Sequence, residues 1–119
     1  MSDSVQIFKA RVLAGCTLTL RNNVIDEYGN AITTGDIDSA TAVIVDQYDA
    51  TDTTTVELTP GSVILDTPLT NTITYNTEWI VDGATYFATA NKTYDVTITY
   101  VSADSAALSY VVKWEVVVV

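Results

Sequence analysis

The chain has 119 residues, of which 48% are hydrophobic and 17% are charged, and its formal net charge at pH 7 is −10. This length and this apolar fraction exclude a disordered chain and predict one globular domain that spans residues 1–119. The acidic charge argues against binding to nucleic acid or to an anionic membrane, because their phosphates would be repelled.

Strand-favouring residues dominate the chain from its start: Thr, Val and Ile account for 45 of the 119 residues. Their branched side chains fit a pleated sheet better than a helix. Val5–Val12 is the first predicted strand, and a break at Ala14-Gly15 separates it from the second, Cys16–Ile25. Within the second strand Cys16 falls in the apolar phase, so we expect it to pack as a small hydrophobic side chain.

The middle of the chain predicts shorter strands separated by turns. A turn at Asp26–Asn30, in which Gly29 or Asn30 adopts a positive φ, precedes the third strand. The polar and acidic segment Tyr48–Thr55 is predicted to be an exposed loop. The other predicted features of this region are the strand Ala40–Gln47, the short strands Val56–Leu58 and Ser62–Asp66 around the Pro60-Gly61 turn, and an end to strand pairing at Pro68.

The C-terminal third has the clearest two-residue alternation. In the predicted strand Thr93–Val101, apolar and polar residues alternate, which indicates one face in the core and one in water. The final predicted strand, Leu108–Val119, ends in residues that are apolar on both faces, so we expect it to lie deep in the fold or to be covered by a neighbour. Before these two strands we expect the strand Thr72–Val81, the Asp82-Gly83 turn and a continuing strand at Ala84–Ala88.

Together these patterns predict an all-β domain of seven to nine short strands with turns about every ten residues, typical of a β-sandwich or a small barrel. No apolar stretch approaches the roughly 20 residues that a membrane-spanning helix needs. The opening MSDSVQIFKA lacks the basic and apolar regions of a secretory signal. We therefore expect folding in a cytoplasm, without disulfide support, since Cys16 has no second cysteine to pair with.

The sequence offers little that could carry out catalysis. It contains no histidine, which excludes Ser-His-Asp catalysis and histidine-ligated metals, and its five glycines form no phosphate-binding loop. We therefore predict a non-enzymatic protein without catalytic residues, cofactor or bound metal. Two alternatives stay open: a pair of carboxylates that acts on glycosidic bonds, and a calcium site in the acidic segments Gly35–Asp38 and Asp46–Asp52, whose aspartates otherwise serve turns.

Aromatic residues raise one further alternative, a carbohydrate-binding module, because Trp79, Trp114 and seven tyrosines could stack on sugars. Four rings fall in the apolar phase of their strands and are expected in the core. They are Tyr94, Tyr100, Tyr110 and Trp114. The candidate interface residues, expected to contact another protein, are Tyr28, Tyr48, Tyr75, Val117 and Val119.

Five stretches that cover nearly the whole chain carry a resemblance to a known family. They are LAGCTLTLRNNVIDEYGNAIT, SATAVIVDQ, SVILDT, WIVDGATYF and NKTYDVTITYVSADSAALSYVVKWEV. Read together, they resemble the small immunoglobulin-like β-sandwich proteins of tailed-bacteriophage virions, which serve in head decoration, in head–tail connection and in baseplates.

The resemblance implies a single immunoglobulin-like antiparallel β-sandwich with no catalytic or cofactor residues. It also implies a structural protein of a phage virion, assembled in the host cytoplasm. We expect a head decoration (cement) protein that stabilises the capsid through contacts with the major capsid protein or other virion proteins, in many copies or as a homo-oligomer. A neck, tail or baseplate component is one alternative, and a non-viral carbohydrate-binding or adhesion module is another.

Overall fold

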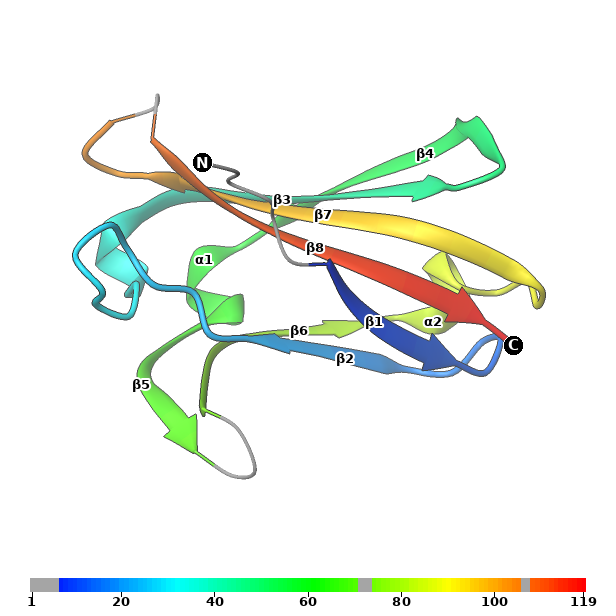
Figure 1. The fold of residues 1–119 in the computed structure, drawn as a ribbon, viewed down its shortest axis with the longest axis horizontal. Helices are drawn as coiled ribbons and strands as arrows, with labels where there is room; N and C mark the ends of the chain where they lie inside the picture. Colours follow the sequence, from blue (N-terminus) through cyan, green and yellow to red (C-terminus); the bar gives the residue numbers. More distant parts are fainter. Residues whose placement is uncertain (1–6, 71–73, 106–107) are drawn as a thin grey trace.

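The computed structural model describes residues 7–70, 74–105 and 108–119, which form two β-sheets packed face to face (Figure 1). The predicted all-β sandwich is therefore confirmed. None of the helices in these residues is long and apolar enough to span a membrane. The elements are β1 (Ile7–Val12), β2 (Leu18–Asn22), a 3-10 turn (Thr34–Asp36), β3 (Ile37–Asp46), β4 (Asp49–Leu58), α1 (Pro60–Val63), β5 (Ile64–Thr70), β6 (Thr74–Val81), α2 (Gly83–Tyr86), β7 (Lys92–Ser102) and β8 (Ser109–Val118).

One sheet has five strands in the order β1-β8-β7-β3-β4, and the other has three in the order β2-β6-β5. The prediction of a purely antiparallel sandwich is wrong for one pair, because β1 runs parallel to β8, from Ile7 opposite Lys113 to Val12 opposite Val118. After β1 the chain crosses to the other sheet instead of returning as a hairpin. The first strand is therefore free to lie alongside the last one in the same direction. The other strand pairs of the described residues are antiparallel.

The core lies between the sheets and follows the predicted alternation. Along β7, Val96, Ile98 and Tyr100 are at most 1% exposed, and the residues between them face outward. On β8, Val116 and Val118 are fully buried. The expectation from the sequence therefore holds for Val116 and Val118, whereas Val117 is half-buried on the outer side of the sheet and Val119 is 38% exposed.

The segment Tyr48–Thr55 is not the loop that the sequence predicted, because β4 begins at Asp49 and pairs with β3 over most of its length. The misassignment has a physical cause. An edge strand receives its hydrogen bonds from one neighbour only, and in β4 no side chain is fully buried. Backbone pairing of this kind tolerates a polar sequence, so the alternation that marks a half-buried strand is missing.

Two predicted strands are partly or wholly helical. Residues Ala84–Ala88 do not continue a strand, because Asp82 caps α2: its carboxylate accepts hydrogen bonds from the Ala84 N–H at 3.1 Å and from the Thr85 hydroxyl at 2.8 Å. In the predicted strand Ser62–Asp66, the first residues belong to α1, and β5 starts only at Ile64. The predicted strand residues 5–6 and 72–73 lie outside the described residues.

The second strand is shorter than predicted, and this exposes the cysteine. Gly15 has φ +80° and the Cys16 N–H donates to the Leu13 carbonyl at 3.0 Å, so this segment turns before β2 begins at Leu18. Cys16 is exposed in this turn, and the expectation that it packs in the core is wrong. The predicted turn at 26–30 is confirmed, with Gly29 at φ +84°.

Candidate functional site

The outward side of the five-stranded sheet is the broadest regular surface of the sandwich, and we call it the outer sheet face. Its members alternate with the buried residues of each strand, so the strand register defines them. They are Ile7, Lys9 and Arg11 on β1, Val111, Lys113, Glu115 and Val117 on β8, Thr93, Asp95, Thr97, Thr99 and Val101 on β7, Thr41, Val43 and Val45 on β3, and Thr53, Thr55 and Glu57 on β4.

The centre of the outer sheet face is almost free of charge. On β7 and β3 it presents threonines and valines that are half-buried, and Asp95 is its one ionisable side chain there. That carboxylate and Glu115 on β8 share a donor, because the side-chain amide of Gln47 donates to Asp95 at 2.8 Å and to Glu115 at 2.9 Å. Depletion of charged side chains is one feature of the centres of protein interfaces.

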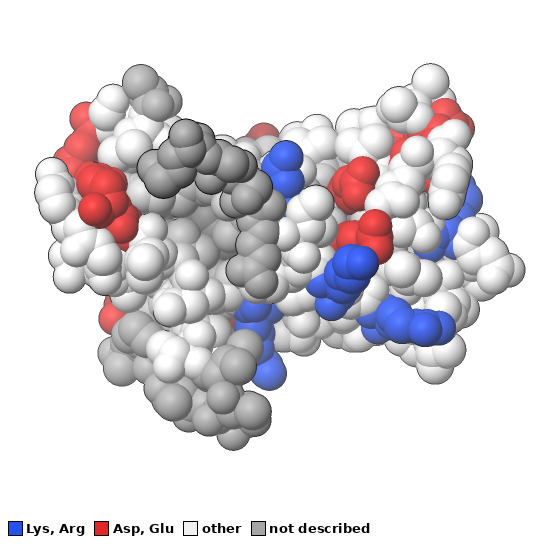
Figure 2. All heavy atoms as spheres, viewed as in Figure 1, with Lys and Arg blue, Asp and Glu red and all other residues white. Residues whose placement is uncertain are grey.

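Charge of opposite sign flanks this centre. On the β1–β8 side stand Lys9, Arg11 and Lys113, and on the β4 side stands Glu57. None of these four takes part in an ion pair within the described residues. In the view of Figure 2, Lys and Arg side chains gather over the region of β1 and β8. The surface therefore combines central strands on which Asp95 is the one charge, strands β1 and β8 with three cations and Glu115, and Glu57 on β4.

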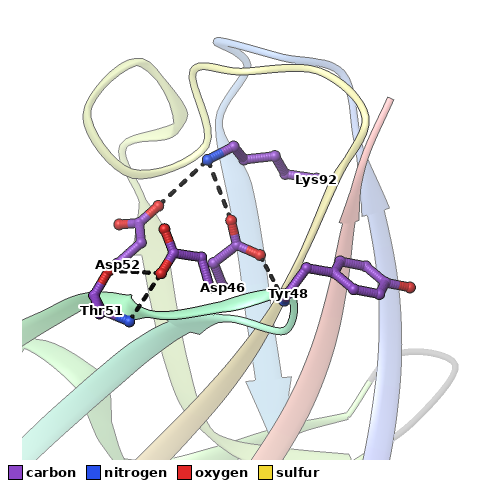
Figure 3. Close-up of polar contacts among 6 residues, drawn as sticks. Asp46, Tyr48, Thr51, Asp52 and Lys92 are labelled. Carbon is purple, nitrogen blue, oxygen red and sulfur yellow. Dashed lines mark hydrogen bonds and ion pairs between the residues drawn. The ribbon is translucent and has the colours of Figure 1, made fainter.

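Lys92 forms ion pairs with two aspartates at the end of the sandwich where β3 turns into β4 (Figure 3). The Lys92 amine lies 3.2 Å from the Asp46 carboxylate and 3.4 Å from that of Asp52, and Asp46 also accepts the Tyr48 N–H at 2.9 Å. The backbone hydrogen bond from Tyr48, helped by Lys92, lowers the pKa of Asp46 below its ordinary value. The hydrogen bond to Asp46 in turn raises the pKa of Lys92. The cluster thus fastens the β3–β4 turn to the start of β7.

Four of the five carboxylates considered for calcium have partners within the chain, and Asp38 is the exception among the described residues. Asp46 and Asp52 face Lys92, Asp49 accepts the backbone N–H and the hydroxyl of Thr51, and Asp36 accepts both groups from Thr33. Across the described ranges, no group of three or more His, Cys, Asp or Glu side chains is arranged to hold a metal ion. These hydrogen bonds are the turn contacts that the sequence offered as the other interpretation of these aspartates.

The five predicted interface residues are not brought together. Tyr28 and Tyr48 are 81% and 87% exposed but lie at opposite ends of the sandwich: Tyr48 is in the turn beside the start of β7, and Tyr28 is in the connection beside the start of β8. Val117 is half-buried on the outer sheet face, and Val119 follows it at the exposed end of β8. Their role as an interface stays a prediction.

Tyr75 is not the exposed contact residue that the sequence predicted, because only 7% of it is accessible. It belongs to β6, which has β2 on one side and β5 on the other. The guanidinium of Arg21 lies 4.9 Å from the centroid of its ring, and Glu78 holds that guanidinium at 2.7 Å. The tyrosine is therefore a packing residue of the three-stranded sheet.

The four rings expected in the core do pack there, although to different degrees. Tyr94 and Tyr100 are buried, and burial raises the pKa of Tyr100 to about 12. Tyr110 and Trp114 are half-buried on β8, where the indole N–H of Trp114 donates to the side chain of Asn22 at 2.9 Å and so joins the two sheets.

The outer sheet face was not predicted from the sequence as a surface, although one signal for it was present. The outward residues of the predicted strand 93–101 are mostly threonine, and in a chain of net charge −10 such a stretch with one carboxylate is unusual. The strands that lie beside it could not be read from the sequence, because neighbours in a sheet are far apart along the chain. Comparison with protein-family models, with curated proteins and with solved structures finds no match to this chain.

Proposed function

We propose that this protein is a non-enzymatic structural component of a tailed-phage particle, namely a head decoration (cement) protein that stabilises the capsid by protein–protein contact. The observation that carries the proposal is the outer sheet face, whose two central strands present threonines and valines with one carboxylate, and whose outer strands carry the other charges. Protein interfaces are built in this way, with charge depleted from the centre and kept at the rim. The lack of histidine in the sequence also favours a binding role over acid–base catalysis.

The order of the strands supports the immunoglobulin-like assignment that the sequence resemblance implies. In variable-type immunoglobulin domains one sheet contains strands C′, C, F and G, and the other contains B, E and D. Here β4, β3, β7 and β8 follow one another in one sheet, and β2, β6 and β5 form the other. If β2 to β8 are matched in chain order to strands B, C, C′, D, E, F and G, they fall into the same two sheets. We therefore propose an immunoglobulin-like sandwich.

The place in the particle is the less specific part of the proposal. A protein that assembles by surface contact in the host cytoplasm fits the capsid surface, where it would bind the major capsid protein in many copies. A neck, tail or baseplate position is the alternative, because the same kind of sheet face serves contacts with other virion proteins equally well.

One hollow favours a second function, a non-viral carbohydrate-binding or adhesion module. It lies between β4 and β6, has a volume of ≈ 360 Å³, and is lined by Trp79, Tyr86 and Leu58 with the carboxylates of Glu57 and Asp82. Aromatic rings and carboxylates suit a sugar. However, Trp79 is only 8% exposed, so little of its ring is open for stacking.

The test of the proposed function is the presence of the protein in particles. Particles from the phage that encodes the sequence would be purified by density gradient and probed with an antibody against the protein, which would also be used for labelling in electron microscopy. We expect many copies per particle, located on the head. Labelling of the neck, tail or baseplate would favour the alternative position, and absence of the protein from intact particles would contradict the proposal.

A further inference from the structure

We propose that the free edge of β4 binds an extended segment of another protein, which joins the five-stranded sheet as a further strand and carries a basic residue between two apolar ones. The inference deepens the proposed function and rests on it in one respect only, that the segment belongs to another virion protein. Three features support it: the unpaired backbone of β4, the hollow beneath that edge, and the charge around it.

β4 is the last strand of its sheet, and among the described residues β3 is its one neighbour (Figure 1). In an antiparallel pair, successive residues direct their N–H and C=O groups to opposite sides of the strand. The Gln47 N–H at the end of β3 donates to the Thr93 carbonyl of β7 at 2.9 Å. Counted back from this bond, the odd-numbered residues of β3 pair with β7, and positions 40, 42 and 44 direct their backbone groups to β4.

This alternation determines which backbone groups of β4 are free. The residues opposite positions 44, 42 and 40 use their N–H and C=O groups to pair with β3, and they are Thr54, Val56 and Leu58. The backbone groups of the residues that alternate with them point to the open side of the strand, and these residues are Thr53, Thr55 and Glu57. An unpaired edge of this kind is a template for another strand, and many proteins protect such edges with lysine or proline. Residues 53–58 include neither.

A hollow lies directly beneath this edge, between β4 and β6, with a volume of ≈ 360 Å³. Val56 and Leu58 point inward from β4 and line it, and they are only half-buried although they pack against the core. Because side chains alternate along a strand, the residues on either side of the one opposite Glu57 in an added strand would also point inward. The hollow can therefore receive two apolar side chains of the added strand, which is how strand addition obtains specificity.

The charge around the edge favours a basic segment. Glu57 is exposed, and it has no ion-pair partner in the part of the chain that the structure describes. Opposite charges directly across two strands stabilise their pairing, and like charges destabilise it. Glu78 and Asp82 also line the hollow, and the described residues that line it include no lysine or arginine. We therefore expect lysine or arginine opposite Glu57.

The experiment follows the backbone amides of the full chain by NMR during titration with defined peptides. The first peptide has nine residues, with one lysine between two valines at its centre, serine and threonine elsewhere, and both ends blocked. The second is the same peptide N-methylated at the lysine and at the residues two positions before and after it, which removes the N–H groups that would face β4. The third has glutamate in place of the lysine.

Two variants of the protein test the charge. Glu57→Lys reverses the charge at the edge, and Asp104→Lys makes the same change in net charge on the connection between β7 and β8. Both positions are exposed, so the fold should be kept, which circular dichroism would check. The wild type and both variants are titrated with each peptide.

We expect the lysine peptide to shift the amide signals of Thr55 and Glu57 in the wild type and to slow their hydrogen exchange. The methylated peptide should bind at least about tenfold more weakly, because it cannot donate hydrogen bonds to β4. The glutamate peptide should bind Glu57→Lys more tightly than it binds the wild type, and Asp104→Lys should bind the lysine peptide as the wild type does.

Unchanged β4 signals, or equal binding of the methylated peptide, would overturn the inference. Shifts at Trp79 and Tyr86 with maltotetraose but not with the peptide would assign the hollow to a sugar, and β4 shifts that grow with protein concentration alone would assign the edge to a second copy; either result would also overturn it. The proposed function is tested separately: peptide binding by a protein that is absent from particles would sink the function alone, and a protein found in particles that ignores the peptide would sink this inference alone.

Discussion

The side-chain amide of Asn76 makes a two-point contact with the backbone of Val24: its Oδ1 accepts the Val24 N–H at 2.7 Å, and its Nδ2 donates to the Val24 carbonyl at 2.8 Å. Asn76 is fully buried on β6, and Val24 is in the segment that leaves β2. Nδ2 also lies 3.4 Å from the Ile32 carbonyl. This one side chain thus satisfies the backbone of a segment that crosses from one sheet to the other.

Substitution of Asn76 should therefore be costly. Asn76→Ala leaves the Val24 N–H without this partner, while the Val24 carbonyl keeps the Ile32 N–H at 3.2 Å, and we expect a loss of about 1 to 3 kcal/mol in the free energy of unfolding. Chemical denaturation would measure it. Asn23→Ala is the matched control, because that amide is exposed and has no hydrogen-bond partner among the described residues, and it should cost less than about 0.5 kcal/mol. Equal losses in the two variants would contradict this role.

A second prediction concerns the close approach of Gly83 to the turn at Cys16. A Cβ at Gly83 would lie 1.7 Å from the Cys16 carbonyl oxygen, so the backbone of one segment would have to move. We expect Gly83→Ala to destabilise the fold by about 3 kcal/mol or more, because overpacking against backbone has no flexible side chain to absorb it. At Gly35 a Cβ meets nothing within 4 Å, so Gly35→Ala is the control in thermal and chemical denaturation. A Gly83→Ala variant as stable as Gly35→Ala would show that the two segments are not in contact.

Acid sensitivity should come from two carboxylates with lowered pKa values. The pKa of Asp46 is lowered by the Tyr48 N–H with help from Lys92, and that of Asp66 is lowered by the N–H and the hydroxyl of Thr34, at 2.7 and 2.8 Å. A lowered folded-state pKa stabilises the protein above the ordinary value of 3.8, and the contribution disappears as pH falls through the folded-state pKa.

The double variant Asp46→Asn with Asp66→Asn tests this dependence. We expect it to melt at a lower temperature than the wild type near neutral pH, and the difference in melting temperature should shrink as the pH falls below about 4. Asp38→Asn, at an exposed carboxylate without a partner among the described residues, should follow the wild type at every pH. A difference in melting temperature that stays constant down to the lowest pH would mean that the charge of neither carboxylate stabilises the fold.

The last strand offers a matched pair of valines on opposite faces. Val116 is fully buried, and Val117 is half-buried on the outer sheet face. Val116→Ala should cost about 2 kcal/mol in the free energy of unfolding because it leaves a cavity, and Val117→Ala about 1 kcal/mol or less. Urea denaturation of both variants would compare them. A larger loss at Val117 would mean that β8 faces the other way.

The alternation of apolar and polar residues predicted those strands that have one solvent-exposed face and one buried face. β7 was recognisable because Val96, Ile98 and Tyr100 alternate with threonines. The edge strand β4 was not, because exposure on both faces removes the alternation. The cap at Asp82 that begins α2 was read as a turn, since four helical residues leave no periodic signal.

The surface was harder to predict than the fold. Exposure of Tyr28 and Tyr48 followed from their turn context, but burial of Tyr75 depends on Arg21 and on flanking strands that come from elsewhere in the chain. The outer sheet face joins residues between positions 7 and 117, and the parallel pairing of β1 with β8 brings Lys9 and Arg11 to its flank. Only the register of the sheet, which single-sequence patterns do not contain, assembles this set.

Cross-linking from a single position on β7 tests the central claim most directly, namely that the outer sheet face contacts another protein in the particle. In a Cys16→Ser background, Thr97→Cys puts a thiol on the middle strand, and Thr19→Cys puts one on the exposed side of the three-stranded sheet as a control. In purified particles, with a photoreactive maleimide on each thiol, Thr97→Cys should give a cross-linked product with another virion protein in high yield, and Thr19→Cys should give little. Equal yields from the two positions, or no cross-linked product from Thr97→Cys, would contradict the account.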